Sequence, residues 1–220
     1  MRRIKIASFI FSLISVIHIV GIILKIARLS LISKPLILLS LIVLYGVSSN
    51  NKNKWYVLAL IFSFFGDVFL MFEGELYFII GLISFLLAHF VFIKIVLKRI
   101  EFTSIKRIYI SSIPFVMFFI LLIFTLKDSL NEMLVPVIVY GLTISAFGTI
   151  SLINYRETKS RKSMAMLIGS ILFMISDSIL AINKFYEPSH YFEVIVMLTY
   201  ILAQYFIYRS MFFERIKDDI

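Results

Sequence analysis

The chain of 220 residues contains no cysteine, so neither disulfide bonds nor thiolate chemistry is open to it. Charged residues make up only 16% of the sequence, against roughly 25% in a soluble domain. No HExxH, CxxC or other dense cluster of metal ligands occurs, and we therefore expect neither a metal site nor a cofactor. The sequence also lacks a G-x-S-x-G nucleophile elbow and a recognisable Ser-His-Asp arrangement.

Apolar residues dominate instead, with 61% of the chain hydrophobic and a mean hydropathy of +1.01. A soluble domain is roughly 45–50% apolar, so the composition predicts an all-α, multi-pass transmembrane helix bundle. We expect residues 1–220 to form a single integral membrane domain, whose basic start is a retained first span rather than a cleaved signal peptide. About eight spans are predicted, at 5–24, 35–49, 55–72, 77–97, 108–126, 133–154, 164–183 and 192–213.

The charge pattern predicts the orientation in a cell membrane. The net charge of +9 is compatible with nucleic acid binding, but the basic residues lie in short loops, where orientation and anionic membrane lipids account for them better. Lysine and arginine gather in the loops on the side of the N-terminus, which predicts that both termini are cytoplasmic. The first outer loop is the exception, because Lys25, Arg28 and Lys34 are expected there.

Two aspartates in apolar spans are the main candidates for function. Asp67 lies in SFFGDVFLMF and Asp177 in GSILFMISDSILAINKF. A carboxylate in hydrocarbon is costly, so such residues usually face a bundle interior or a watery cavity. Both spans run outward in the predicted topology, which places both carboxyls roughly 8–9 Å below the outer surface. We therefore expect one shared site.

Other polar residues accompany the aspartates. Lys184 follows Asp177 by seven residues and is expected on the same helix face, near Asn183. Tyr200 and Gln204 fall on one polar stripe of the last span, where hydrogen bonding between helices is the alternative interpretation. His89 is expected deeper in its span, as a structural residue or a second catalytic candidate.

Two neighbouring carboxyls in a low dielectric cannot both ionise easily, so one keeps its proton near neutral pH. The pair then offers a general acid and a general base, which suits reactions through an oxocarbenium-like state. Proton-coupled transport would use the same pair equally well. The residues alone leave both alternatives open.

Several motifs resemble the YhhN-type lysoplasmalogenase family. These are GDVFLMF, the segment from Gly81 to His89, Lys34-Pro35-Leu36, SDSILAINKF and EVIVMLTYILAQYFI. The resemblance implies an eight-span membrane hydrolase that cleaves the vinyl ether bond of lysoplasmalogens. The products would be a fatty aldehyde and a glycerophospho-base.

The resemblance also implies roles for particular residues. Asp67 and Asp177 would be catalytic, and a lysophospholipid in the bilayer would be the substrate. Substrate-binding residues would be Lys34, Lys184, Asn183, Tyr200, Gln204 and His89. The alternative is a small proton-coupled transporter or a lipid-binding protein with the same aspartate pair. Inverted repeats would favour a transporter, but the two aspartates lie four predicted spans apart, whereas inversion needs an odd offset.

Overall fold

The computed structural model describes residues 2–48, 52–101 and 103–218, with side chains up to residue 212. Within these residues the chain forms eight α-helices and one 3-10 helix, and no strand. The α-helices are α1 (Arg2–Ile23), α2 (Ala27–Ser48), α3 (Lys54–Phe69), α4 (Glu75–Leu97), α5 (Ile105–Leu126), α6 (Leu134–Thr158), α7 (Arg161–Phe185) and α8 (His190–Asp218). The 3-10 helix η1 (Asn131–Met133) precedes α6. The prediction of an all-helical bundle is confirmed.

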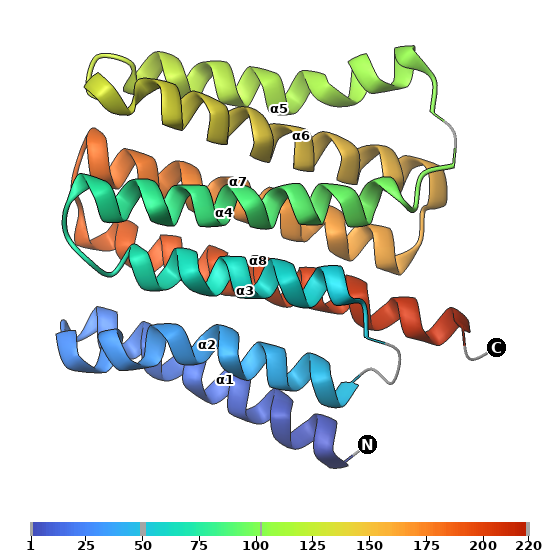
Figure 1. Cartoon of the computed structure of the whole chain (residues 1–220), viewed down its shortest axis with the longest axis horizontal. Coiled ribbons are helices and arrows are strands. Elements are labelled where there is room, and N and C mark those ends of the chain that lie inside the picture. The colour runs from blue at the N-terminus through green and yellow to red at the C-terminus, as the bar shows by residue number, and fades with distance from the viewer. Residues whose placement is uncertain (1, 49–51, 102, 219–220) are drawn as a thin grey trace.

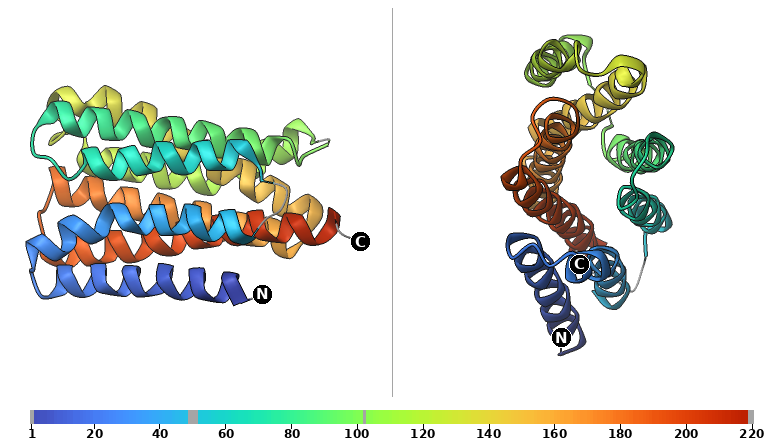
Figure 2. Two further views of the ribbon diagram at one scale, coloured as in Figure 1. Left: turned by 60° about the horizontal axis from the view of Figure 1, so that its bottom comes forward. Right: turned by 90° about the vertical axis from the view of Figure 1, so that its left-hand side faces the viewer.

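Consecutive helices form antiparallel hairpins, and α1 begins at the same end of the bundle where α8 ends (Figure 1). Seen end-on, the α7–α8 hairpin lies across from the α3–α4 hairpin (Figure 2). Helix α6 contacts both α4 and α7, while α2 contacts both α3 and α8. These six helices therefore surround a central space, and side chains from opposite sides meet in it.

Aromatic side chains fill the middle of this space. The ring of Phe85 on α4 meets the rings of Phe173 on α7 and Tyr200 on α8, at centroid distances of 6.1 and 6.0 Å. Phe173 and Tyr200 themselves lie 5.4 Å apart in a perpendicular arrangement. Edge-to-face contacts of this kind add stability beyond the burial of area. They hold the two hairpins at a fixed separation.

Polar residues start several helices by accepting otherwise unpaired backbone N–H groups. The Asn53 side chain accepts from the N–H groups of Trp55 and Tyr56 at the start of α3. Ser160 and Ser163 form a reciprocal capping box at the start of α7. These caps fix where the helices that carry the aspartates begin.

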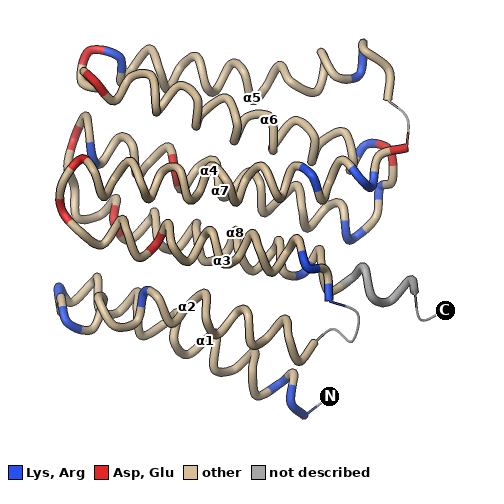
Figure 3. The backbone as a smooth tube through the Cα atoms, in the orientation of Figure 1, with Lys and Arg blue, Asp and Glu red and all other residues tan. Residues whose placement is uncertain are grey.

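Seven of the helices are long and apolar enough to cross a membrane. Helix α3 is the exception, because its 16 residues span about 24 Å, less than the roughly 30 Å of a hydrocarbon core. Lysine and arginine concentrate at the end where α1 begins, whereas most acidic residues lie at the opposite end (Figure 3). Length, composition and charge are those of a multi-pass membrane protein.

Among the boundaries that differ from the sequence prediction, two affect the site directly. Helix α2 begins at Ala27 rather than near Pro35, so Pro35 lies inside the helix and not in its first turn. Lys34 consequently belongs to the bundle and not to the outer loop where we expected it. Proline is tolerated inside membrane helices because neighbouring groups satisfy the freed backbone carbonyl.

Helix α3 ends at Phe69, three residues earlier than predicted. The chain forms a tight turn there, in which the N–H of Phe72 donates to the carbonyl of Phe69. It then turns toward α4 at Gly74, whose φ of 114° favours glycine. Asp67 therefore lies two residues from its helix end, whereas Asp177 lies eight residues from the end of α7. The predicted spans place Asp67 about five and Asp177 about six residues before their ends, so both helix ends differ from the prediction. The equal depth of the two carboxyls stays a prediction.

Candidate active site

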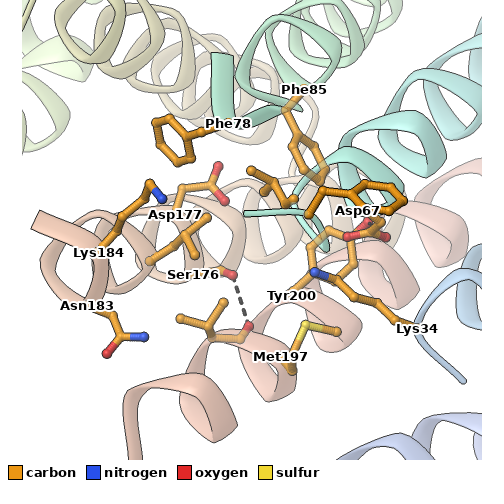
Figure 4. Close-up of a pocket in the computed structure, with 14 residues that line it drawn as sticks. Lys34, Asp67, Phe78, Phe85, Ser176, Asp177, Asn183, Lys184, Met197 and Tyr200 are labelled. Atoms are coloured by element: carbon orange, nitrogen blue, oxygen red, sulfur yellow. Dashed lines mark hydrogen bonds between the residues drawn. The ribbon is translucent and has the colours of Figure 1, made fainter. Parts of the chain in front are cut away.

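A cavity of about 260 Å³ opens among α2, α3, α4, α7 and α8, toward the end of the bundle that carries the α3–α4 and α7–α8 connections. Figure 4 shows the side chains around it. Its polar lining residues are Lys34, Asp67, Ser176, Asp177, Asn183, Lys184 and Tyr200. The remaining lining residues are apolar and include Phe78 and Phe85. The cavity thus combines a few converging polar groups with apolar walls, as small-molecule sites usually do.

Asp67 projects from the last turn of α3 and is only 3% exposed. The Tyr200 hydroxyl on α8 donates a hydrogen bond of 2.7 Å to its Oδ2 atom. The preceding Gly66 has no side chain because Phe85 occupies that space: a Cβ there would lie 2.5 Å from the Phe85 ring. The Gly-Asp pair therefore lets α4 approach α3 while the carboxyl faces the cavity.

Asp177 is half-buried on α7, on the other side of the same cavity. The Tyr140 hydroxyl on α6 donates a hydrogen bond to its Oδ2 atom. The neighbouring Ser176 donates to the carbonyl of Val196 at 2.9 Å and so ties α7 to α8 (Figure 4). The charges of Asp67 and Asp177 lie close enough to interact. Each carboxyl thus has a tyrosine donor of its own.

Two lysines flank the carboxyls. Lys34 on α2 extends toward Asp67 and interacts with it electrostatically (Figure 4). Lys184 is exposed at the end of α7, with its Nζ atom 4.6 Å from the centre of the Phe78 ring. This cation–π contact holds the ammonium group over the cavity rim. The cavity therefore has one cation at its rim and a second one inside it, beside Asp67.

Asn183 and Gln204 form hydrogen bonds that support the structure around the cavity. The Asn183 Oδ1 atom accepts from the N–H of Ser189 at 2.6 Å, which braces the connection between α7 and α8. Gln204 is fully buried one turn beyond Tyr200 and donates to its hydroxyl at 3.4 Å. Asn183 lines the cavity, whereas Gln204 lies behind Tyr200 and supports it.

His89 is fully buried outside the cavity lining. Its Nδ1 atom lies 2.8 Å from the carbonyl of Phe85, and its ring packs against those of Tyr140, Phe147 and Phe173. This placement matches the structural interpretation of His89 better than a contact with substrate. Lys25 and Arg28 are exposed and also lie outside the cavity lining.

Tyr140 is the residue that sequence reasoning missed. It lies among apolar residues of α6, and only the folded chain brings it to Asp177. The available signal was that a buried carboxyl needs a hydrogen-bond donor, and a buried tyrosine hydroxyl needs an acceptor.

No group of three or more histidine, aspartate or glutamate side chains gathers within the part of the chain that the structure describes. The titratable groups that line the cavity are two carboxyls, each with a tyrosine donor, and two lysines. Such a set can give, take or hold a proton beside a bound anionic group.

The sequence profile of the YhhN family matches residues 29–211. A search of curated proteins and a search of solved structures each returned no match. The matched region covers most of the chain and contains every residue that lines the cavity. It also contains the motifs on which the resemblance was based. The chain belongs to the YhhN family.

Proposed function

We propose that this protein is a lysoplasmalogenase-like membrane hydrolase, which cleaves the vinyl ether bond of a lysophospholipid by general acid–base catalysis. The resemblance to the YhhN-type family suggests the reaction. The observation that carries the proposal is that Asp67 and Asp177 line one cavity, each with its own tyrosine donor.

The first step protonates carbon. Asp177 donates its proton to the vinyl carbon that does not bear oxygen, and positive charge develops on the other vinyl carbon and the ether oxygen. We assign this role to Asp177 because Lys34 interacts with Asp67 and favours the ionised form there, which leaves the proton of the pair on Asp177. A protonated Asp177 can still accept the hydrogen bond from Tyr140.

The second step adds water. Asp67 acts as the carboxylate, because Lys34 and the Tyr200 hydroxyl both stabilise a negative charge there. It stabilises the cation and accepts a proton from the water that attacks the carbon. The product is a hemiacetal, with Asp67 protonated and Asp177 ionised.

The third step restores both groups. Asp177 takes the hydroxyl proton of the hemiacetal, the bond from carbon to the former ether oxygen breaks, and Asp67 returns its proton to the departing alcohol. A fatty aldehyde and a glycerophospho-base leave. The balance requires water alone as co-reactant.

The flanking lysines bind the headgroup in this proposal. Lys184 at the rim and Lys34 deeper in the cavity would attract the lipid phosphate as positive point charges. The apolar walls would accept the hydrocarbon portion of the substrate.

The proposal includes eight membrane crossings with both termini in the cytoplasm of the cell. Its support is that α1 begins and α8 ends at the more basic end of the bundle (Figures 1 and 3). Helix α3 would cross together with its adjoining turn, sheltered by α2 and α4. The cavity would then open toward the outer leaflet.

The test is an assay of aldehyde release by the purified protein in lipid bilayers. Three lysophospholipids with one headgroup are compared: an alkenyl ether, a saturated alkyl ether and an acyl ester. We expect aldehyde from the alkenyl ether alone. Release of fatty acid from the ester, with no aldehyde from the alkenyl ether, would refute the proposed reaction.

A further inference from the structure

A second, smaller chamber of about 40 Å³ adjoins the main cavity at Asp177. The residues that line both spaces are Leu70, Phe78, Phe85, Asp177 and Leu180. Apart from Asp177 and Tyr140, its lining is hydrocarbon, including Leu82 on α4, Val137 on α6 and Ala181 on α7. Asp177 thus stands between a polar space and an apolar one.

The chemistry of the proposed function sets the direction of the substrate, and the inference rests on that function. The phosphate lies at the lysines of the main cavity, and the bond that breaks must lie at the two carboxyls. The hydrocarbon chain must then leave the reacting carbon on the side away from the lysines. The small chamber is an apolar space that adjoins Asp177, and neither lysine lines it.

The size of the chamber limits what enters it. A volume of 40 Å³ corresponds to about three water-sized atoms, because one such atom needs roughly 10–15 Å³. A straight chain fits with its first carbons in single file. A methyl branch next to the double bond would force the packed walls apart, which costs about tenfold in affinity.

We infer that the chamber between α4, α6 and α7 binds the first carbons of a single unbranched alkyl chain, and that Ala181 and Val137 set this selectivity. The small side chain of Ala181 leaves the space open from α7, and Val137 bounds it from α6.

Binding can be measured separately from catalysis with saturated 1-O-alkyl glycerophosphocholines, which lack the reactive double bond. Calorimetry on the protein in nanodiscs compares a linear hexyl ether, its 3-methyl-branched isomer and a methyl ether too short to reach the chamber. We expect the linear ether to bind about tenfold more tightly than the branched one. Equal affinities for the two hexyl ethers would overturn the inference.

Two variants change the chamber in opposite directions. Ala181→Leu fills the chamber and should lower the affinity for the linear hexyl ether by about tenfold. The affinity for the methyl ether should change by less than about twofold. Val137→Ala enlarges the chamber and should bring the affinity for the branched ether to within about threefold of that for the linear ether. Met164→Leu, at an exposed position of α7 outside the chamber, is the matched control and should change neither affinity.

The outcomes separate this inference from the proposed function. If Ala181→Leu changes the chain selectivity but the protein releases no aldehyde from an alkenyl ether, the inference on the chamber stands and the proposed reaction is wrong. If the protein releases aldehyde but neither chamber variant changes the chain selectivity, the proposed reaction stands and the inference on the chamber is wrong. Thermal unfolding of each variant in nanodiscs checks that it is folded. If one chamber variant does not fold, the other alone is sufficient to compare the affinities for the linear and branched ethers.

Discussion

The Tyr200 hydroxyl donates a 2.7 Å hydrogen bond to Oδ2 of Asp67, although the two residues are separated by 133 positions in the chain. The bond joins α8 to α3 across the central space, and Tyr140 makes the corresponding bond to Asp177 from α6. Each carboxyl is therefore oriented by a helix other than its own. A carboxyl held in this way keeps its direction toward the cavity.

Removal of the Tyr200 hydroxyl should impair catalysis. Tyr200→Phe keeps the ring contacts with Phe85 and Phe173 but deprives Asp67 of its donor. Hydrogen bonds to charged groups are worth about 1.5–3 kcal/mol, so kcat should fall by about tenfold to a hundredfold. Tyr208→Phe is the control on the same helix, since that hydroxyl pairs with Ser48 away from the cavity. Equal activity of the two variants would contradict the role of Tyr200.

Tyr140→Phe should act on the other carboxyl. We expect a loss of kcat similar to that of Tyr200→Phe, together with a displaced limb in the pH profile, because the proton affinity of the pair changes when a donor is lost. If the variant yields less folded protein, but the folded protein keeps the pH profile of the wild type, Tyr140 has a structural role only. The profile is measured on aldehyde release from the reconstituted protein.

The two lysines should differ in their kinetic effects. Lys184→Ala should raise KM by about tenfold with little change in kcat, since an exposed rim cation binds the phosphate equally in ground and transition states. Lys34→Ala should lower kcat as well, because Lys34 also interacts with Asp67. Lys25→Ala, exposed and outside the cavity lining, should leave both constants unchanged. An unaltered KM in both cavity variants would remove these lysines from the headgroup site.

The orientation can be tested by labelling, because the chain contains no natural cysteine. Single cysteines at Glu73 or Glu187 should react with a membrane-impermeant maleimide from outside intact cells. Lys52 precedes the start of α3 and Arg161 begins α7, so both lie at the opposite end of the bundle from Glu73 and Glu187. Cysteines at Lys52 or Arg161 should react only after the membrane is opened. The reverse pattern would place the cavity on the cytoplasmic side.

Hydrophobic runs were sufficient to predict the eight helices, because a membrane helix must be apolar over most of its length. The same reasoning singled out Asp67 and Asp177, since a charge in such a run is costly without a function. Lys184 was placed beside Asp177 by helical spacing, and both line the cavity. These predictions depend only on properties local to one helix.

Other features depend on contacts between helices and could not be predicted in this way. Tyr140 reaches Asp177 only because α6 packs against α7. Lys34 was assigned to a loop because Pro35 suggested a helix start, whereas packing carries α2 through the proline. The position of Asp67 near the end of α3 follows from the tight turn that leads to Gly74. Sequence periodicity contains no information on which faces of different helices meet.

The proposed acid–base pair is tested most directly by aldehyde release from an alkenyl lysophospholipid by three variants, Asp67→Asn, Asp177→Asn and the double variant. Each asparagine keeps the shape of the side chain but can neither ionise nor give up a proton. Each single change should lower kcat by at least about a hundredfold, and the double change should cost little more, because the two groups act as one unit. Near-wild-type kcat in either single variant, folded in the same bilayer, would contradict catalysis by this pair.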